Sequence, residues 1–199
     1  MEIYLIRHTR PGVPEGTCYG RTDVPLDEAD FAQRVPAIAD HLPAGMAFYS
    51  SPATRCARLA ESLAARTGGA LAALDARLHE LHFGDWEGRL WRDLPRAETA
   101  SWSADIAGVA PPNGESFGAL WARVNAFYDA TLAAALAAEV PRLAIVGHAG
   151  SLKVLVLRAL RLAPADYMQA DVAQGRVSCI DVRQTGAGAV RERLLFLNR

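Results

Sequence analysis

The chain opens with an apolar run that leads directly into an arginine and a histidine. Residues 3–6 (I-Y-L-I) precede Arg7 and His8, and Pro11 and Gly12 follow soon afterwards. A short apolar run with β-branched and aromatic members, closed by proline and glycine, predicts a strand that is buried on both faces. Such strands are typical of parallel sheets flanked by helices, where ligands bind beyond the carboxyl ends of the strands. We therefore expect Arg7 and His8 to lie at a substrate site, with an ordinary loop histidine as the alternative.

A second apolar run, residues 46–50, also predicts a buried strand. Ser51 and Pro52 follow it as an expected N-cap with proline at the first helical position, and apolar residues at helical spacing extend to about residue 66. Arg55 then lies in the first turn of a helix, where a cation opposes the helix dipole unless an anion binds nearby. Arg55 is therefore a candidate anion ligand, and an exposed arginine of high helix propensity is the alternative.

A third apolar run, residues 143–146, repeats the pattern of the first. It is followed by Gly147 and His148, and a helix is expected over about residues 152–162. The free backbone N–H groups at the start of such a helix favour an anion. His148 is therefore a second candidate site histidine at the carboxyl end of a predicted strand.

Turn residues, caps and apolar periodicity predict the remaining elements. They are a loop over residues 11–26, a helix from an N-cap at Asp27 to about residue 41, a strand over 71–74, a loop over 78–88, a helix over 89–104, a loop over 107–114, a helix from residues 115–116 to about 138, and strands over 177–183 and 190–197 joined by a turn at 186–188. We see no regular internal repeat and no linker, so we expect residues 1–199 to form a single domain.

The composition argues against several classes of protein. A hydrophobic fraction of 51% and a charged fraction of 22% indicate a globular chain, and a net charge of -1 predicts neither a nucleic-acid nor a membrane partner. We expect no signal peptide and no transmembrane helix, because the start lacks a basic region and no run approaches the ~20 apolar residues of a membrane span. Three cysteines without a C-x-x-C pair suggest no disulfide framework or zinc site and fit a cytoplasmic protein. The oligomeric state stays open, with a homodimer among the alternatives.

The predicted strand ends and adjacent loops carry two arginines, two histidines and one carboxylate, namely Arg7, His8, Arg55, Glu80 and His148. These groups are the ones that phosphoryl transfer through a phosphohistidine requires. Arginines neutralise the phosphoryl oxygens, one histidine attacks phosphorus, the other stabilises charge, and the carboxylic acid protonates the departing oxygen. This chemistry needs no metal and no cofactor. His79 and His82 have i, i+3 spacing but no matching cluster elsewhere, so we expect no metal site there.

Five separated motifs resemble the histidine phosphatase superfamily, which includes the cofactor-dependent phosphoglycerate mutases. L-I-R-H at residues 5–8 is similar to the family's R-H signature, and Y-S-S-P-A-T-R at residues 49–55 to its S-S-P-x-x-R segment. L-H-E-L-H-F-G-D-W-E-G at residues 78–88 is similar to L-x-E-x-x-x-G-x-W-E-G, and N-G-E-S at 113–116 and V-G-H-A-G at 146–150 match two further segments. The resemblance implies an α/β fold, a three-layer α/β/α sandwich with a mostly parallel central sheet.

The resemblance also implies a role for each site residue. His8 would be the nucleophile that accepts the phosphoryl group, and Arg7, Arg55 and His148 would form the phosphate pocket. Glu80 would be the general acid that later deprotonates the hydrolytic water. The implied partner is a small-molecule phosphate monoester.

We expect four further residues around this pocket to contact the substrate, namely Thr9, Tyr19, Arg21 and Ala149. Thr9 and Pro14 stand where the family commonly has glycine and asparagine, and Leu59 stands where a threonine is usual. None of these differences removes a proposed catalytic residue. They argue against assigning the substrate by analogy with the commonest members of the family.

Two features narrow the expected activity. The R-H-T-R-P opening and G-T-C-Y-G-R-T-D-V-P-L at residues 16–26 look similar to the α-ribazole phosphatase branch, which acts in assembly of the nucleotide loop of cobalamin. Ser101 follows Trp91 by only ten positions, which leaves little room for the segment that mutases insert near the active site. We therefore expect a phosphomonoesterase, a hydrolase of the histidine acid phosphatase type, acting on α-ribazole 5′-phosphate. The alternatives are a phosphatase of another small phosphometabolite, a phosphoglycerate mutase, and an inactive member that binds a phosphorylated ligand or a protein.

Overall fold

In the computed structural model, six strands form one sheet in the order β3-β2-β4-β1-β5-β6. The strands are β1 (Glu2–Arg7), β2 (Ala47–Ser50), β3 (Ala70–Leu74), β4 (Arg142–Gly147), β5 (Val177–Gln184) and β6 (Val190–Phe196). The pairs β1–β4, β2–β4 and β2–β3 are parallel, whereas β5 pairs antiparallel with both β1 and β6. The prediction of a mostly parallel sheet is therefore confirmed. The structure describes residues 1–185 and 189–199, so the turn predicted at 186–188 lies outside the described residues.

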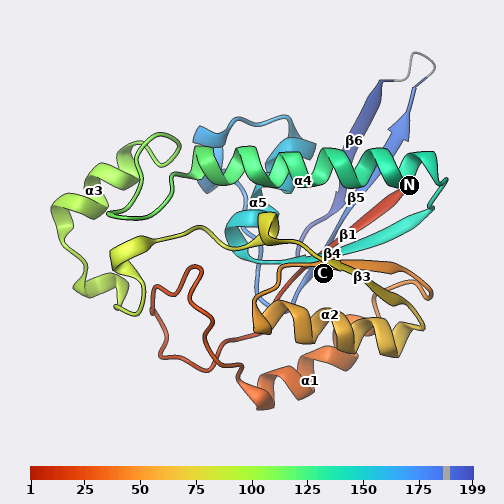
Figure 1. Cartoon of the computed structure of the whole chain (residues 1–199), viewed down its shortest axis with the longest axis horizontal. Helices are drawn as coiled ribbons and strands as arrows, with labels where there is room; N and C mark the ends of the chain where they lie inside the picture. Colours follow the sequence, from red (N-terminus) through yellow and green to blue (C-terminus); the bar gives the residue numbers. More distant parts are fainter. Residues whose placement is uncertain (186–188) are drawn as a thin grey trace.

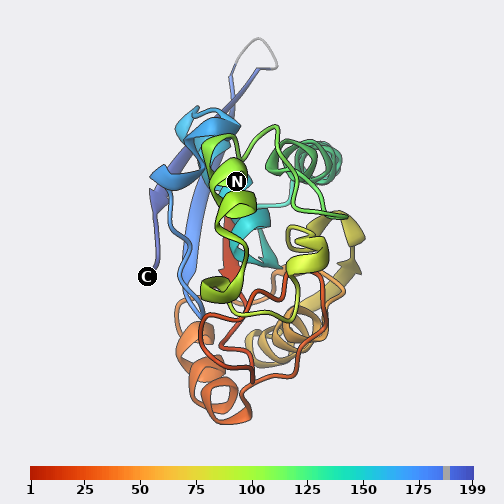
Figure 2. The same ribbon diagram turned by 90° about the vertical axis from the view of Figure 1, so that its left-hand side faces the viewer.

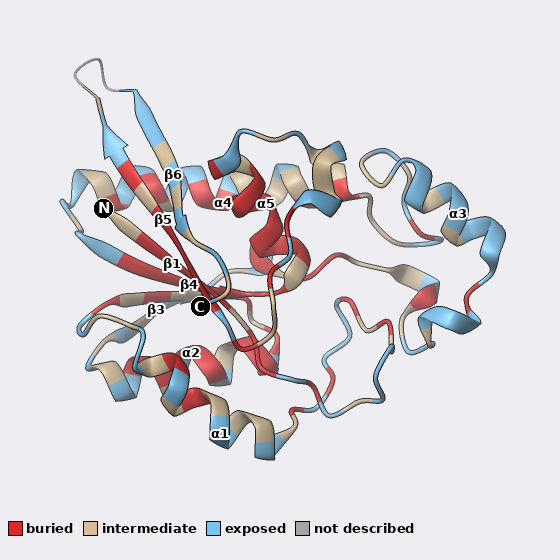
Figure 3. Ribbon diagram, turned by 180° about the vertical axis from the view of Figure 1, so that it is seen from behind, coloured by how far each residue is buried: buried red, intermediate tan, exposed pale blue. Residues whose placement is uncertain are grey.

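Helices cover both faces of the sheet and complete the predicted three-layer α/β/α fold (Figures 1 and 2). They are α1 (Glu28–Ala39), α2 (Thr54–Thr67), α3 (Arg96–Ala104), α4 (Phe117–Ala137) and α5 (Ala149–Leu160). α1 and α2 pack on one face, and α4 and α5 pack on the other. α3 lies apart from the sheet and has no buried residue (Figure 3). Within the described ranges, no helix combines the length and the apolar character that crossing a membrane requires.

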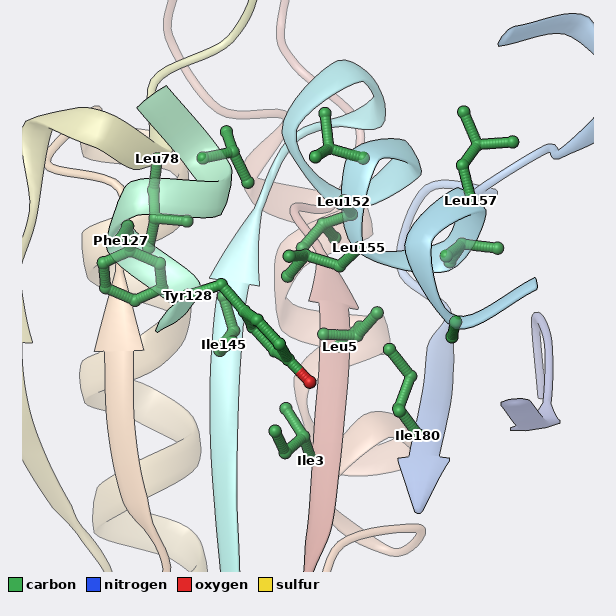
Figure 4. Close-up of a cluster of buried hydrophobic side chains, with 14 of the residues drawn as sticks. Ile3, Leu5, Leu78, Phe127, Tyr128, Ile145, Leu152, Leu155, Leu157 and Ile180 are labelled. Carbon is green, nitrogen blue, oxygen red and sulfur yellow. The ribbon is translucent and has the colours of Figure 1, made fainter. Parts of the chain in front are cut away.

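Alternating side chains of β1 supply the hydrophobic cores on both sides of the sheet. Ile3 and Leu5 pack with residues of α4 and α5, whereas Tyr4 and Ile6 pack with residues of α1 and α2. Figure 4 shows the first of these clusters, in which Ile3 and Leu5 lie below side chains of the two helices. Successive side chains of a strand point to opposite faces, so an uninterrupted apolar run is what a central, doubly covered strand needs. The buried strand predicted at the start of the chain is confirmed.

The register of β1 against β4 brings together two segments from opposite ends of the sequence. Arg7 pairs with Gly147 in the parallel ladder between the two strands. His8, which follows β1, and His148, which follows β4, therefore lie at the same edge of the sheet. This register is the structural basis of the site.

Helix α2 begins later than predicted. Its N-cap is Ala53, which makes no side-chain cap, and not Ser51. The carboxylate of Asp23 instead accepts a hydrogen bond from the backbone N–H of Thr54 at 3.0 Å. The hydroxyl of Ser51 instead lies 2.8 Å from Nε2 of His148, within hydrogen-bond distance. The local cap signal was wrong because a distant loop supplies the cap.

The predicted helix over residues 89–104 is only partly correct. The chain forms a 3-10 turn at Trp91–Asp93 and then α3, which starts after Pro95. Proline lacks a backbone N–H and disfavours helical geometry in the residue before it, so the helix cannot continue through this position.

Helix α5 begins three residues earlier than predicted, because His148 itself is the N-cap. The hydroxyl of Ser151 accepts a hydrogen bond from the backbone N–H of His148 at 3.1 Å. The caps of two other helices agree with prediction, since Asp27 caps α1 and Ser116 caps α4 through their side chains. α1 ends at Ala39, slightly before the predicted boundary.

Candidate active site

Two histidines face each other at the carboxyl edge of the sheet. The ring centroids of His8 and His148 are 5.2 Å apart, and both side chains are completely buried. His8 follows β1 and His148 follows β4, so the pairing of these two strands fixes the distance between the rings. The sequence prediction that the two histidines share one site agrees with this arrangement.

His8 is held as a neutral imidazole with one free nitrogen. Its Nδ1 lies 2.7 Å from the carbonyl oxygen of Thr9. Because a carbonyl oxygen only accepts, Nδ1 carries the hydrogen and Nε2 carries the lone pair. Nε2 is buried and has no hydrogen-bond partner among the described residues. Burial, followed by the charges of Arg55 and Arg7, holds the pKa of His8 well below its ordinary value.

Two guanidinium groups are anchored beside His8 by backbone carbonyls. Nη1 of Arg7 donates to the carbonyl of Val172 at 2.6 Å. Arg55 is completely buried, and its Nη1 and Nη2 donate to the carbonyls of Thr22 at 3.0 Å and Gly20 at 2.8 Å. The Nε of each arginine is buried without a partner among the described residues. Both side chains therefore keep unpaired N–H donors in a region that suits an anion.

Glu80 is attached to the start of α5. Its Oε1 accepts hydrogen bonds from the backbone N–H groups of Leu81 and Gly150, both at 2.9 Å. The loop that carries Glu80 is held in turn by Arg123 of α4, which donates to the carbonyls of Arg77, His79 and Glu80 at 2.7 to 2.9 Å. The carboxylate is thus positioned through two helices and lies on the same helix terminus as His148.

His148 is oriented from the β2 side of the sheet. Its Nε2 lies 2.8 Å from the hydroxyl oxygen of Ser51. Burial, and then the charges of Arg55 and His8, lower the pKa of His148 well below its ordinary value. A neutral imidazole at this position hydrogen-bonds without adding a positive charge to a pocket that already contains two guanidinium groups.

Tyr19 contacts this group of residues and also lines a cavity in the long loop after β1. Its ring meets the ring of His8 edge-on at 6.2 Å between centroids, and Cζ of Arg55 lies 5.1 Å from its centroid. Its hydroxyl oxygen accepts a hydrogen bond from Gln174 at 3.3 Å. The cavity has a volume of about 630 Å³ and is lined by Tyr19, Gln174, Asp27 and residues 10–17.

The other predicted substrate contacts differ in their surroundings. Thr9 is completely buried, and its hydroxyl has no hydrogen-bond partner among the described residues. Ala149 is the first residue of α5, directly after His148. Arg21 forms an ion pair with Glu115 at 3.0 Å, and its side chain is 39% exposed. The structure thus gives Arg21 a carboxylate partner outside the pocket formed by Arg7, His8, Arg55 and His148.

Several residues of the site carried no recognisable sequence signal. Arg123 lies 43 residues from Glu80, and no local pattern connects the two. Ser51 looked like a helix cap. Within residues 1–185 and 189–199, no group of three or more His, Cys, Asp or Glu residues is arranged to hold a metal ion.

Known proteins share both sequence and fold with this chain. The adenosylcobalamin/alpha-ribazole phosphatase of Salmonella typhimurium is 37% identical over 108 residues, which are 53% of this chain and 52% of that protein. The chain thus spans about half the length of these curated relatives.

Solved structures match over a much larger share of the chain. The crystal structure of the alpha-ribazole phosphatase from Shigella flexneri is 28% identical, with a TM-score of 0.81 over 100% of this chain and 96% of that one. A mycobacterial glucosyl-3-phosphoglycerate phosphatase is 25% identical, with a TM-score of 0.82 over 99% and 98% of the two chains. Residues 3–193 match the family model of the histidine phosphatase superfamily (branch 1). The chain therefore belongs to the histidine phosphatase superfamily.

Proposed function

We propose that the protein is a phosphomonoesterase that works through a phosphohistidine intermediate. The observation that carries this proposal is the free, buried Nε2 of a neutral His8 beside two anchored arginines with unpaired donors. A neutral imidazole nitrogen is a nucleophile, and fixed guanidinium groups stabilise the negative charge on phosphoryl oxygens. Family membership supports the same chemistry.

The reaction has two steps. In the first, Nε2 of His8 attacks phosphorus, the P–O ester bond breaks, and protonated Glu80 gives its proton to the departing alcohol oxygen. In the second, Glu80 takes a proton from water, the resulting hydroxide attacks phosphorus, and the N–P bond breaks to release phosphate. Arg7, Arg55 and His148 hold the phosphoryl oxygens in both steps.

We propose α-ribazole 5′-phosphate as the substrate. Two similar proteins carry the name alpha-ribazole phosphatase. Tyr19, whose ring contacts that of His8, also lines a cavity of about 630 Å³, a volume common for small-molecule sites, although none of the five proposed catalytic residues lines it. A phosphatase of another sugar phosphate is the second candidate, which the structural similarity to a glucosyl-3-phosphoglycerate phosphatase supports.

The test is phosphate release from a panel of monoesters that contains α-ribazole 5′-phosphate, 3-phosphoglycerate and simple sugar phosphates. Isomerisation of 3-phosphoglycerate is followed in parallel. We expect release from α-ribazole 5′-phosphate to have the highest kcat/KM and isomerisation to be slower than hydrolysis. Faster isomerisation would identify a mutase and contradict the proposal, and phosphate binding without turnover would indicate an inactive binding protein.

The proposal includes the setting in which the enzyme works. We propose that residues 1–199 act as a single domain, that the protein is cytoplasmic, and that it forms a homodimer. The three unpaired cysteines support a reducing compartment. The edge strand β6, where Leu195 is 40% exposed, supports association. Light scattering after gel filtration measures the oligomeric state.

A further inference from the structure

Lys153 lies on the face of α5 that supports Glu80. It follows Ala149 and Gly150 by four and three residues, and residues at this spacing are neighbours on one side of a helix. The backbone N–H of Gly150 donates to Glu80. The sole lysine of the chain therefore stands one helical turn from the residue that positions the proposed general acid.

The ammonium of Lys153 lies over the ring of Tyr167. Nζ lies 4.0 Å from the centroid of the Tyr167 ring, a cation–π geometry. Burial lowers the pKa of Lys153; of the nearby charges, Asp171 and Glu80 raise it and Arg7 lowers it.

The ammonium of Lys153 has no conventional partner. Its residue is only 9% exposed, yet among the described residues no carboxylate lies within 4.0 Å of Nζ and no acceptor receives a hydrogen bond from it. The aromatic ring of Tyr167 interacts with the positive charge but satisfies at most one of its three N–H donors. Nζ is not among the fully buried polar atoms that lack a partner, so it is accessible, and a ligand oxygen can accept a hydrogen bond from it.

The position of Lys153 indicates which part of a substrate it meets. Arg7, Arg55 and His148 already surround the phosphoryl group, whereas Glu80 must lie beside the oxygen that leaves. A donor on the Glu80 side therefore faces the alcohol portion. Sugar phosphates carry ring and hydroxyl oxygens a few bonds from the ester oxygen, and simple aryl esters carry none there.

We propose that Nζ of Lys153, backed by Tyr167, donates a hydrogen bond to a sugar oxygen of the leaving group and thereby selects sugar phosphates over simple esters. The proposal rests on the phosphomonoesterase function given above. It assigns Lys153 to substrate selection and gives it no part in the proton transfers.

The experiment compares Lys153→Met with the wild type on D-ribose 5-phosphate, 4-nitrophenyl phosphate and 3-phosphoglycerate. Methionine keeps the unbranched shape and removes the donors. We expect kcat/KM for D-ribose 5-phosphate to fall roughly 10- to 100-fold more than for 4-nitrophenyl phosphate, as for loss of a hydrogen bond from a charged donor. Lys153→Gln keeps a neutral donor and should lose less kcat/KM for D-ribose 5-phosphate. It replaces the methionine variant in the comparison if that variant does not fold. Arg66→Met removes an exposed charge from α2 as the control.

An equal loss on D-ribose 5-phosphate and 4-nitrophenyl phosphate would overturn the assignment, and so would no loss on either. A larger loss on 3-phosphoglycerate than on D-ribose 5-phosphate would show that the ammonium serves a carboxylate, which also overturns it. Binding of D-ribose 5-phosphate to His8→Ala, with and without Lys153→Met, is measured by calorimetry. Weaker binding in the double variant supports the role of Lys153 even if no ester is hydrolysed, which separates this proposal from the proposed function.

Discussion

The carboxylate of Glu80 accepts a hydrogen bond from the backbone N–H of Gly150, with 2.9 Å between Oε1 and the nitrogen. Gly150 belongs to the first turn of α5, so this bond fixes Glu80 to the helix that His148 caps. A Cβ atom at position 150 would collide with the same Oε1 and lie 3.0 Å from Leu120. A glycine is needed at position 150 because only a residue without Cβ lets the Glu80 carboxylate come this close to the helix backbone. The position of Glu80 in the site depends on this contact.

Gly150→Ala should displace the Glu80 carboxylate while leaving α5 helical. We expect kcat for an alkyl phosphate to fall by roughly 10-fold or more, since small displacements of a catalytic group reduce rates strongly. The loss should be smaller for 4-nitrophenyl phosphate, whose leaving group needs little protonation. Steady-state kinetics with both esters and circular dichroism of the variant measure the two expectations. A similar loss on both esters would argue that the substitution acts on the pocket in general.

Glu80→Gln removes the acid but keeps the shape of the side chain. General acid catalysis contributes about 10²- to 10⁴-fold, so we expect losses of this order for alkyl esters and much smaller losses for nitrophenyl esters in the first chemical step. Burst kinetics isolate that step from hydrolysis of the intermediate. Equal losses in the burst rate for both classes would contradict an acid role for Glu80.

His8→Ala should reduce turnover by roughly 10³-fold or more, because it removes the proposed nucleophile. Rapid acid-free denaturation of the wild type after mixing with a ³²P-labelled ester should trap phosphate on the protein in an acid-labile form. The label should be absent from His8→Ala and present in a variant of His41, an exposed histidine outside the site. Unchanged activity in His8→Ala would remove the whole mechanism.

Arg123→Met should affect stability and activity together. The substitution leaves three backbone carbonyls of the Glu80 loop without their donor and also removes two hydrogen bonds to Glu115. An unsatisfied acceptor costs at least about 1 kcal/mol, so we expect the free energy of unfolding to fall by about 3 kcal/mol or more. Urea denaturation and kcat measure the two effects, with the exposed Arg66→Met as the control. Full activity in a destabilised variant would show that Arg123 does not position Glu80.

The two buried histidines predict how stability depends on pH. Both have pKa values well below the ordinary 6.5 in the folded state, chiefly through burial, whereas in the unfolded chain they titrate normally. Below pH ~6.5 the unfolded state therefore binds more protons than the folded state. The contribution of the two histidines to the free energy of unfolding is complete above this pH and decreases as the pH is lowered further. Each histidine contributes a slope of up to about 1.4 kcal/mol per pH unit.

Urea denaturation between pH 7.5 and 5.5, in buffer without phosphate, measures this slope. His148→Gln should flatten it, and His41→Gln, at an exposed position, should not. A free energy of unfolding that stays constant or rises toward pH 5.5 would contradict the expected neutral state of the two histidines.

The parts of the fold that the sequence predicted are those that depend on local patterns. The apolar runs around Ile6, Phe48 and Ile145 identified three central strands, because a strand covered on both faces must be apolar throughout. The histidines after the first and third runs could be expected at one edge, because parallel strands end together. The order and direction of the strands alone place these two histidines together, without reference to any side-chain contact.

The errors and omissions involve residues that act across long distances in the sequence. α2 starts at Thr54 because Asp23, 31 residues earlier in the sequence, caps it. The Ser51 hydroxyl is therefore not needed as a helix cap and contacts His148. Arg123 holds the Glu80 loop from another helix. Such contacts depend on how elements pack, and neither propensity nor periodicity encodes packing.

The place of β1 in the middle of the sheet has a consequence for the timing of activity in the cell. The ribosome makes β1 before its neighbours β4 and β5, which begin only at Arg142 and Val177, and Arg7 is anchored by Val172. The proposed nucleophile, His8, therefore emerges long before the residues that complete the site around it. The proposed site therefore stays incomplete in a nascent chain until Val172 and β5 have been synthesised, so activity should appear only after that point.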